Sequence, residues 1–140
     1  MRWPGKVPVG RVSDAVFATI DFIPTFASLA GFDVPDDRRI DGIDQTELLF
    51  GKRETGRDHF YFQAAGVRQG KWKYLKADAH FYGYAIENDR EKAEELYDLE
   101  ADLGEQSNLA TKFPERVAEL RALMQSIEGG DKLDPAANKR

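Results

Sequence analysis

Residues 65–77 read AGVRQGKWKYLKA, and this stretch decides the fold because it predicts a β-hairpin. Apolar and charged residues alternate on both sides of Gln69 and Gly70. A glycine in a two-residue hairpin turn supplies the positive φ that the turn requires. With those two residues as the turn, apolar residues oppose each other on one face: Val67 with Trp72, and Ala65 with Tyr74. The chain should therefore contain an antiparallel sheet built around this hairpin.

Three cations fall on the other face of the predicted hairpin: Arg68, Lys71 and Lys73. Guanidinium and ammonium groups bind sulfate or carboxylate through charge-assisted hydrogen bonds. Exposed cations also keep a sheet edge from pairing with another chain. The sequence leaves both interpretations open, and the three residues are candidates for substrate binding.

Further elements extend this sheet and cover it. Residues 59–63, HFYFQ, and residues 95–99, ELYDL, predict two more short strands. Pro114 opens a helix, which Gly129 and Gly130 should end. Its apolar stripe recurs every three or four residues: Phe113, Val117, Leu120, Met124 and Ile127. This order predicts an α+β fold, with an antiparallel sheet of three or four strands and a C-terminal helix packed on one face.

The first part of the chain predicts helices instead of strands. Asp21 can cap a helix that ends at Gly31. The apolar residues of this helix are Phe22, Ile23, Phe26 and Leu29. A second, shorter helix should begin at a capping box formed by Asp44 and Glu47.

The polar stretch GKRETGRD at residues 51–58 is the clearest boundary in the chain. We therefore predict three parts: residues 1–57, residues 58–128 and a flexible tail of residues 129–140. Residues 77–94 have no clear period and predict a loop or an insertion.

Composition narrows the class of protein. With 140 residues and 41% hydrophobic residues, the chain is typical of one soluble globular domain. Its net charge of −5 argues against nucleic acid or an anionic membrane surface as the main partner. No apolar run approaches the roughly 18 residues that a membrane span needs.

The sequence carries no motif for catalysis or metal binding. Zero cysteines exclude a disulfide, a thiolate metal site and a cysteine nucleophile, and the two histidines, His59 and His80, are too few for a histidine-rich metal site. The G-x-S-x-G elbow, the phosphate-binding P-loop and the dinucleotide-binding glycine motif are all missing. We therefore predict no catalytic and no metal-binding residue in this chain.

The acidic stretch ELYDLEADLGEQSNLA at residues 95–110 invites a calcium interpretation, which its spacing contradicts. An EF-hand loop begun at Asp98 requires glycine at its sixth position and glutamate at its twelfth. Leu103 and Leu109 occupy those positions. The alternatives are a solvated strand and turn, buried carboxylates for acid–base chemistry, or the mark of a family.

Five motifs in order carry a resemblance to a known family. They are RWPGKV at 2–7, TIDFIPTFASLAG at 19–31, DGID at 41–44 with LLFG at 48–51, VRQGKWKYL at 67–75 and ELYDLEADLGEQSNLA at 95–110. Together they resemble the C-terminal third of the type I sulfatases, the arylsulfatase family of the alkaline-phosphatase-like superfamily. Leu103 stands where this family commonly has proline, which should loosen the turn.

The resemblance implies an enzyme that hydrolyses sulfate esters with a calcium ion and a formylglycine made from C/S-x-P-x-R. In the family these parts lie in the large N-terminal α/β domain. None of these parts can be carried onto this sequence. Each of its serines lacks the proline two residues later and the arginine four residues later that the motif requires: Ser13, Ser28, Ser107 and Ser126. The resemblance thus implies a C-terminal fragment that is inactive alone and has a structural or cleft-shaping role.

The resemblance also predicts partners and a compartment. Residues 1–57 would be the last elements of the large sulfatase domain, and residues 58–128 its C-terminal subdomain. The helix with Phe22, Ile23, Phe26 and Leu29 would then lack its cover, which predicts self-association besides contact with the rest of the sulfatase. Export of the parent to the periplasm or the medium follows by family analogy.

Two alternatives to a sulfatase fragment stay open. The chain could be a free-standing binding or regulatory module derived from a sulfatase. It could also belong to a related phosphatase or phosphonate hydrolase of the same superfamily. Charge and periodicity do not separate these possibilities, and they do not name a substrate.

Overall fold

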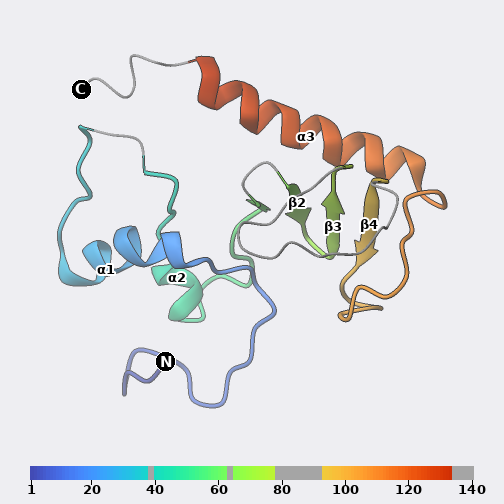
Figure 1. Ribbon diagram of the computed structural model, residues 1–140. Helices are drawn as coiled ribbons and strands as arrows, with labels where there is room; N and C mark the ends of the chain where they lie inside the picture. Colours follow the sequence, from blue (N-terminus) through green and yellow to red (C-terminus); the bar gives the residue numbers. More distant parts are fainter. Residues whose placement is uncertain (38–39, 63–64, 78–92, 134–140) are drawn as a thin grey trace, which may run out of the picture. The chain divides into compact units, whose positions relative to one another are not determined.

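The computed structural model describes residues 1–37, 40–62, 65–77 and 93–133. These residues form two compact units, residues 1–58 and residues 59–133. The first unit holds short helices, and the second holds a sheet with one long helix (Figure 1). None of the helices in these ranges is long and apolar enough to cross a membrane.

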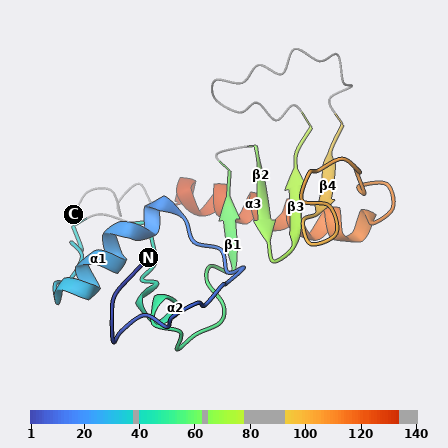
Figure 2. The ribbon, with the colours of Figure 1, turned by 90° about the horizontal axis from the view of Figure 1, so that it is seen from below.

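The second unit is a four-stranded antiparallel meander under one helix. The strands β1 (His59–Tyr61), β2 (Gly66–Gln69), β3 (Trp72–Leu75) and β4 (Glu95–Asp98) lie side by side in chain order. Helix α3 (Pro114–Leu133) lies along one face of the sheet, as Figures 1 and 2 show from two directions. The predicted α+β architecture is confirmed.

The hairpin of β2 and β3 forms, but its register differs from the expected one by two residues. Val67 lies opposite Tyr74, and Gln69 lies opposite Trp72. The turn is therefore made by Gly70 and Lys71, with φ of 57° at Gly70. Glycine at the first turn position is the requirement of a type II′ turn, whereas the prediction placed it second. Because a shift of two residues preserves the faces, Val67 and Tyr74 still face the core.

One apolar cluster joins the sheet to the helix. Its buried members come from both layers: Val67, Tyr74, Leu96, Val117, Leu120 and Met124. Full burial of such a side chain stabilises the fold by about 1.5–3 kcal/mol. Four residues of the stripe predicted for the helix meet this cluster: Val117, Leu120, Met124 and Ile127. The fifth, Phe113, lies before the helix and is 37% exposed, so its place in the stripe is wrong.

The end of α3 differs from the prediction. The helix continues through Gly129 and Gly130 to Leu133. A glycine inside a helix costs only about 1 kcal/mol, so two of them weaken a helix without stopping it. The last residues of the predicted tail, most of the predicted loop at 77–94 and His80 lie outside the described residues.

A second link between sheet and helix is polar. The Arg121 side chain of α3 donates from Nε to Glu94 Oε1 at 2.7 Å, and the Tyr74 hydroxyl donates to the same oxygen at 2.6 Å. The hydrogen bond from Arg121 lowers the pKa of Glu94 despite its partial burial. Burial and the bond to Glu94 raise the pKa of Tyr74 to about 12. This clamp ties β3, the start of β4 and the helix together.

The first unit is organised around a buried carboxylate. The 3-10 turn η1 (Thr19–Asp21) leads into helix α1 (Phe22–Ala30), and Asp21 is completely buried between them. Its carboxylate accepts from Arg57 Nη2 at 2.6 Å and from the Ile43 backbone N–H at 2.9 Å. Burial alone would raise the pKa of Asp21, but these hydrogen bonds outweigh it and lower the pKa. Asp21 stands at the N-cap position as predicted, yet its side chain makes no capping bond to α1.

Helix α2 (Thr46–Leu49) starts differently from the prediction as well. Its N-cap is Gln45, so the capping box expected from Asp44 and Glu47 is wrong. The reason is that Gln45 is fully buried, where its Oε1 accepts from Arg53 Nη2 at 2.6 Å. Asp44 instead accepts from the Thr46 backbone N–H at 2.8 Å. As predicted, the turn after this helix ends at Gly51, with φ of 72°.

Two glycines permit the close approaches in this unit. A Cβ atom at Gly42 would lie 2.1 Å from the Ile20 carbonyl oxygen, and one at Gly56 would lie 2.2 Å from the Val16 oxygen. Both distances are far below contact, so the backbone itself excludes a side chain at each position. The glycine of DGID therefore lets the chain reach the Asp21 carboxylate.

Loss of the Asp21 charge should unfold the first unit. We expect Asp21→Asn to lower the free energy of unfolding by about 3 kcal/mol, since it leaves the largely buried side chain of Arg57 without its counter-ion. Urea unfolding followed by Trp3 fluorescence, in a Trp72→Phe background, measures this. The exposed Asp36→Asn is the matched control, and equal midpoints for the two variants would contradict the role of Asp21.

The polar clamp makes the second unit sensitive to acid. The folded pKa of Glu94 lies below its ordinary value of 4.5, so its stabilisation is present above that value and is lost as the pH falls through the folded pKa. The stability difference between wild type and Glu94→Gln should therefore shrink between pH 5 and pH 3. The exposed Glu115→Gln is the control, and its stability difference from wild type should not change over this pH range. A difference between wild type and Glu94→Gln that stays constant from pH 5 to pH 3 would count against the clamp.

Candidate functional site

The candidate site is a row of side chains across the face of the sheet that α3 leaves uncovered. Strand register places Phe60, Arg68, Lys73 and Tyr97 directly opposite one another on β1 to β4. Val67 and Tyr74 face the helix, so their sequence neighbours Arg68 and Lys73 face away from it. We call this set the outer row. It brings two of the three predicted cations together, Arg68 and Lys73.

Two like charges directly opposite each other on neighbouring strands destabilise a sheet. Glu105 offsets this repulsion, because both of its carboxylate oxygens lie 2.7 Å from Lys73 Nζ. The same ammonium lies 5.6 Å from the centroid of the Phe62 ring. Lys73 is therefore held by an internal counter-ion and an aromatic ring.

Lys71 lies apart from the outer row because the observed register places it in the turn. Its ammonium donates to Asp98 Oδ2 at 2.6 Å and sits 5.1 Å from the centroid of the Trp72 ring. The hydrogen bond between them raises the pKa of Lys71 and lowers that of Asp98. The prediction that Lys71 shares a face with Arg68 and Lys73 is thus wrong.

Arg68 is the cation of the outer row with donors to spare. Its Nε donates to the Gly70 carbonyl oxygen at 2.9 Å, which anchors the guanidinium to the turn. Within the described ranges, its two Nη groups make no hydrogen bond or ion pair. A guanidinium fixed at its base in this way presents a planar fork suited to a sulfate or a carboxylate.

The acidic stretch serves as the scaffold of this face. Asp98 Oδ1 accepts from the Glu100 backbone N–H at 3.1 Å, and Asp102 Oδ2 accepts from the backbone N–H groups of Gln106 and Ser107 at 2.8 Å. Glu105 adopts φ of 54°, which makes it the one non-glycine residue of positive φ among those described. Its strained backbone aims the carboxylate at Lys73.

Asn108 closes the free edge of β4. Its Oδ1 accepts from the Leu96 backbone N–H at 3.1 Å, and its Nδ2 donates to the Glu94 carbonyl oxygen at 3.1 Å. An unpaired strand edge invites pairing with other chains, and this amide satisfies it instead. Sequence reasoning missed the roles of Asn108 and Glu105.

Calcium and the formylglycine nucleophile that the resemblance implies each require particular residues. Among them, no group of three or more histidine, cysteine, aspartate or glutamate side chains is arranged to hold a metal ion. The chain also has no C/S-x-P-x-R motif. These residues therefore do not fit either group, and the site offers charge and hydrogen-bond donors to an anion.

Comparison with known proteins places the chain in a family. Residues 1–129 match the family described as N-sulphoglucosamine sulphohydrolase, C-terminal. The chain belongs to this sulphohydrolase C-terminal family. The N-acetylgalactosamine-6-O-sulfatase of Bacteroides thetaiotaomicron is 33% identical over 135 residues, which cover 91% of this chain and 26% of the relative. Arylsulfatase G of Rattus norvegicus is 32% identical, and the match covers 81% of this chain and 24% of the relative.

Solved structures agree with the family assignment. A structure from the study of glycosaminoglycan metabolism by Bacteroides thetaiotaomicron has a TM-score of 0.73 at 32% identity and covers 91% of this chain and 28% of that one. Another structure, in complex with its substrate D-glucosamine-2-N,6-O-disulfate, has a TM-score of 0.66 at 28% identity. This match covers 99% of this chain and 29% of the other. The chain thus spans about a quarter of the length of its curated relatives, and the resemblance to the C-terminal part of a sulfatase is confirmed.

Proposed function

We propose that this chain works as the C-terminal domain of an enzyme that hydrolyses sulfate esters. The observation that carries the proposal is the family match over residues 1–129, supported by sulfatase relatives at 32–33% identity. The chain would complete the fold and shape the substrate cleft. The calcium ion and the formylglycine of the enzyme would be held by residues outside this chain. This chain alone would therefore be inactive.

We further propose a sulfated amino sugar as the substrate class. Two of the bacterial relatives are named for sulfate on N-acetylgalactosamine or N-acetylglucosamine, and the substrate in the complex structure is D-glucosamine-2-N,6-O-disulfate. In a saccharide of this kind, sulfate or carboxylate groups remain on sugar units beside the one that reacts. A cation at the wall of the cleft can therefore bind a charge that takes no part in the chemistry.

Arg68, Lys71 and Lys73 are proposed as contacts for such remote charges, with unequal roles. Arg68 would bind an anion directly, because its Nη groups have no partner within the described ranges. Lys73 would attract the anion electrostatically from a distance, because Glu105 already holds its ammonium group. Lys71 would contact the substrate from the turn, beside Asp98.

Removal of the Arg68 charge should weaken substrate binding in the enzyme. In the longer polypeptide that contains this chain, Arg68→Gln should raise KM for a sulfated disaccharide about 3- to 10-fold and change kcat less, since a remote contact acts alike in the ground state and the transition state. Lys52→Gln, at an exposed position of the first unit, makes the same charge change and should leave KM unaltered. An unchanged KM for Arg68→Gln would refute its role, and a longer polypeptide without sulfatase activity would refute the proposed function.

The exposed face of α1 supports a docking role. Phe17, Phe22 and Phe26 form a ladder of rings with centroids 5.4 Å apart, and Ile23 beside them is 65% exposed. We propose that the rest of the enzyme covers this face and that, in the isolated chain, a second copy does so through Phe22, Ile23, Phe26 and Leu29. Contiguous exposed apolar surfaces of this kind are typical of interfaces.

Self-association of the isolated chain can be measured directly. Light scattering should give a mass above the 15.8 kDa of one chain, and Ile23→Lys should return the mass to that value. Val12→Lys, at an exposed residue outside the helix, should leave the mass unchanged. A monomeric wild type that binds no hydrophobic dye would contradict the proposal.

A free-standing binding module is the second candidate function, and the exposed face of α1 favours it equally. The DNA upstream of the Met1 codon separates the two. A continuous reading frame that encodes C/S-x-P-x-R supports the enzyme. A stop codon and a ribosome-binding site directly before that codon support the module.

A further inference from the structure

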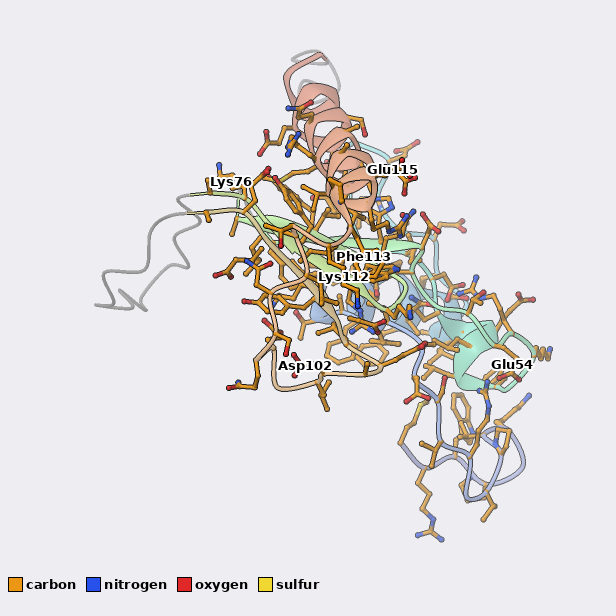
Figure 3. The ribbon with its side chains drawn as sticks, turned by 90° about the vertical axis from the view of Figure 1, so that its right-hand side faces the viewer. Glu54, Lys76, Asp102, Lys112, Phe113 and Glu115 are labelled. Atoms are coloured by element: carbon orange, nitrogen blue, oxygen red, sulfur yellow. The ribbon has the colours of Figure 1, made fainter. Side chains whose placement is uncertain are left out.

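A pair of aromatic rings lies at the end of the sheet where the chain enters α3. Trp72 of β3 and Phe113 meet edge to face, with ring centroids 5.4 Å apart and an interplanar angle of 63°. Phe113 is 37% exposed, and among the described residues of the second unit only Leu103 is another exposed large apolar residue. Figure 3 shows Phe113 beside Lys112 at this end of the helix.

A lysine ammonium group lies over each of the two rings. The Nζ atom of Lys71 lies 5.1 Å from the Trp72 centroid, and that of Lys112 lies 5.4 Å from the Phe113 centroid. Both distances fall within the range of cation–π contacts. We call these four residues the basic–aromatic patch.

Both lysines of the patch are at least partly exposed, although Asp98 and Glu100 act on the charge of Lys71. The Lys71 side chain is 38% exposed, whereas that of its counter-ion Asp98 is only 13% exposed. Lys112 is exposed, and in the described part of the chain its ammonium makes no ion pair. A ligand therefore meets the ammonium of Lys112, the partly exposed ring of Phe113 and, beside them, the Lys71 ammonium that Asp98 holds.

Main-chain hydrogen bonds hold both lysines in place. The Lys71 carbonyl oxygen accepts from the Leu99 N–H at 2.8 Å. The N–H groups of Lys112 and Phe113 both donate to the Leu109 carbonyl oxygen at 3.0 Å. These bonds fix the main chain of the two turns, so binding costs the rotamer freedom of the lysine side chains but no ordering of the backbone.

From this geometry we infer that the basic–aromatic patch binds a sulfated saccharide chain, away from the outer row. The exposed part of the Phe113 ring offers apolar contact to the C–H groups of a sugar, and sulfate groups accept hydrogen bonds from ammonium groups. A nucleic acid fits less well, since its dense phosphates need many cations and the chain carries a net charge of −5. The inference rests on the proposed function for its ligand class: the patch would hold a polymeric substrate while one of its units is processed.

The test measures binding of a chondroitin 6-sulfate hexasaccharide to the 140-residue chain by calorimetry at 50 mM salt. Lys112→Gln should raise Kd about 5- to 10-fold, which is the range for a lost charge-assisted hydrogen bond. Phe113→Leu, which keeps apolar volume but removes the ring, should raise Kd about 3-fold or more. Both variants should keep the wild-type melting temperature, which shows that they fold.

Lys52→Gln is the matched control, because it removes one exposed lysine charge from the first unit. Its Kd should equal that of the wild type, and the desulfated hexasaccharide should bind at least 10-fold more weakly. An equal loss in Lys52→Gln and Lys112→Gln would overturn the inference, as would equal binding of the desulfated sugar. Equally tight binding of a single-stranded DNA of matched charge would also overturn it.

The hydrolysis of N-acetylgalactosamine 6-sulfate by the longer polypeptide keeps the two proposals distinguishable. A failure there would refute the proposed function and leave the binding comparison intact. Normal hydrolysis together with an unchanged Kd for Lys112→Gln would refute only the inference about the patch.

Discussion

The second unit depends on one constraint: a four-stranded sheet has two faces, and the single helix α3 covers only one. The helix side is filled by apolar residues such as Val67, Leu96 and Leu120, which are almost completely buried. The other side must be stabilised by different means. It carries Arg68 and Lys73 opposite each other, and Glu105 supplies the opposite charge. Charged side chains therefore stabilise the face of the sheet that the helix leaves uncovered.

The acidic stretch follows from the same constraint. Five carboxylates in residues 95–105 resemble a metal loop when they are read along the chain. In the folded chain, three of them have different partners. Asp98 and Asp102 accept hydrogen bonds from backbone N–H groups of the turns, and Glu105 pairs with Lys73. A carboxylate committed to a backbone or an ammonium group is a poor metal ligand, because its oxygens are already engaged. The stretch is thus a scaffold for the cationic face.

The first unit solves a related problem with a buried charge. Asp21 has no access to solvent, so its carboxylate is stabilised by Arg57 and by backbone N–H groups of separate segments. This links α1 to the DGID motif through a contact 22 residues apart in the chain. It also orients the helix so that Phe22, Ile23 and Phe26 remain exposed. The polar centre and the apolar exterior of this unit are two results of one arrangement.

The sequence by itself determined the α+β class, the apolar face of the hairpin and most of the apolar stripe of α3, because period-two and period-3.6 patterns record which side chains meet a core. The family came from a different signal, the resemblance of five motifs in their order. The tertiary structure alone decided the register of the turn, since Gly70 can serve at either turn position and only the neighbouring strands choose. It also decided the partners of the charges: nothing in the spacing of Asp21 and Arg57, or of Lys73 and Glu105, predicts that they pair. Ion pairs between distant residues depend on the fold that brings them together, and for that reason the counter-ion of Lys73 and the basic–aromatic patch were visible only in the folded structure.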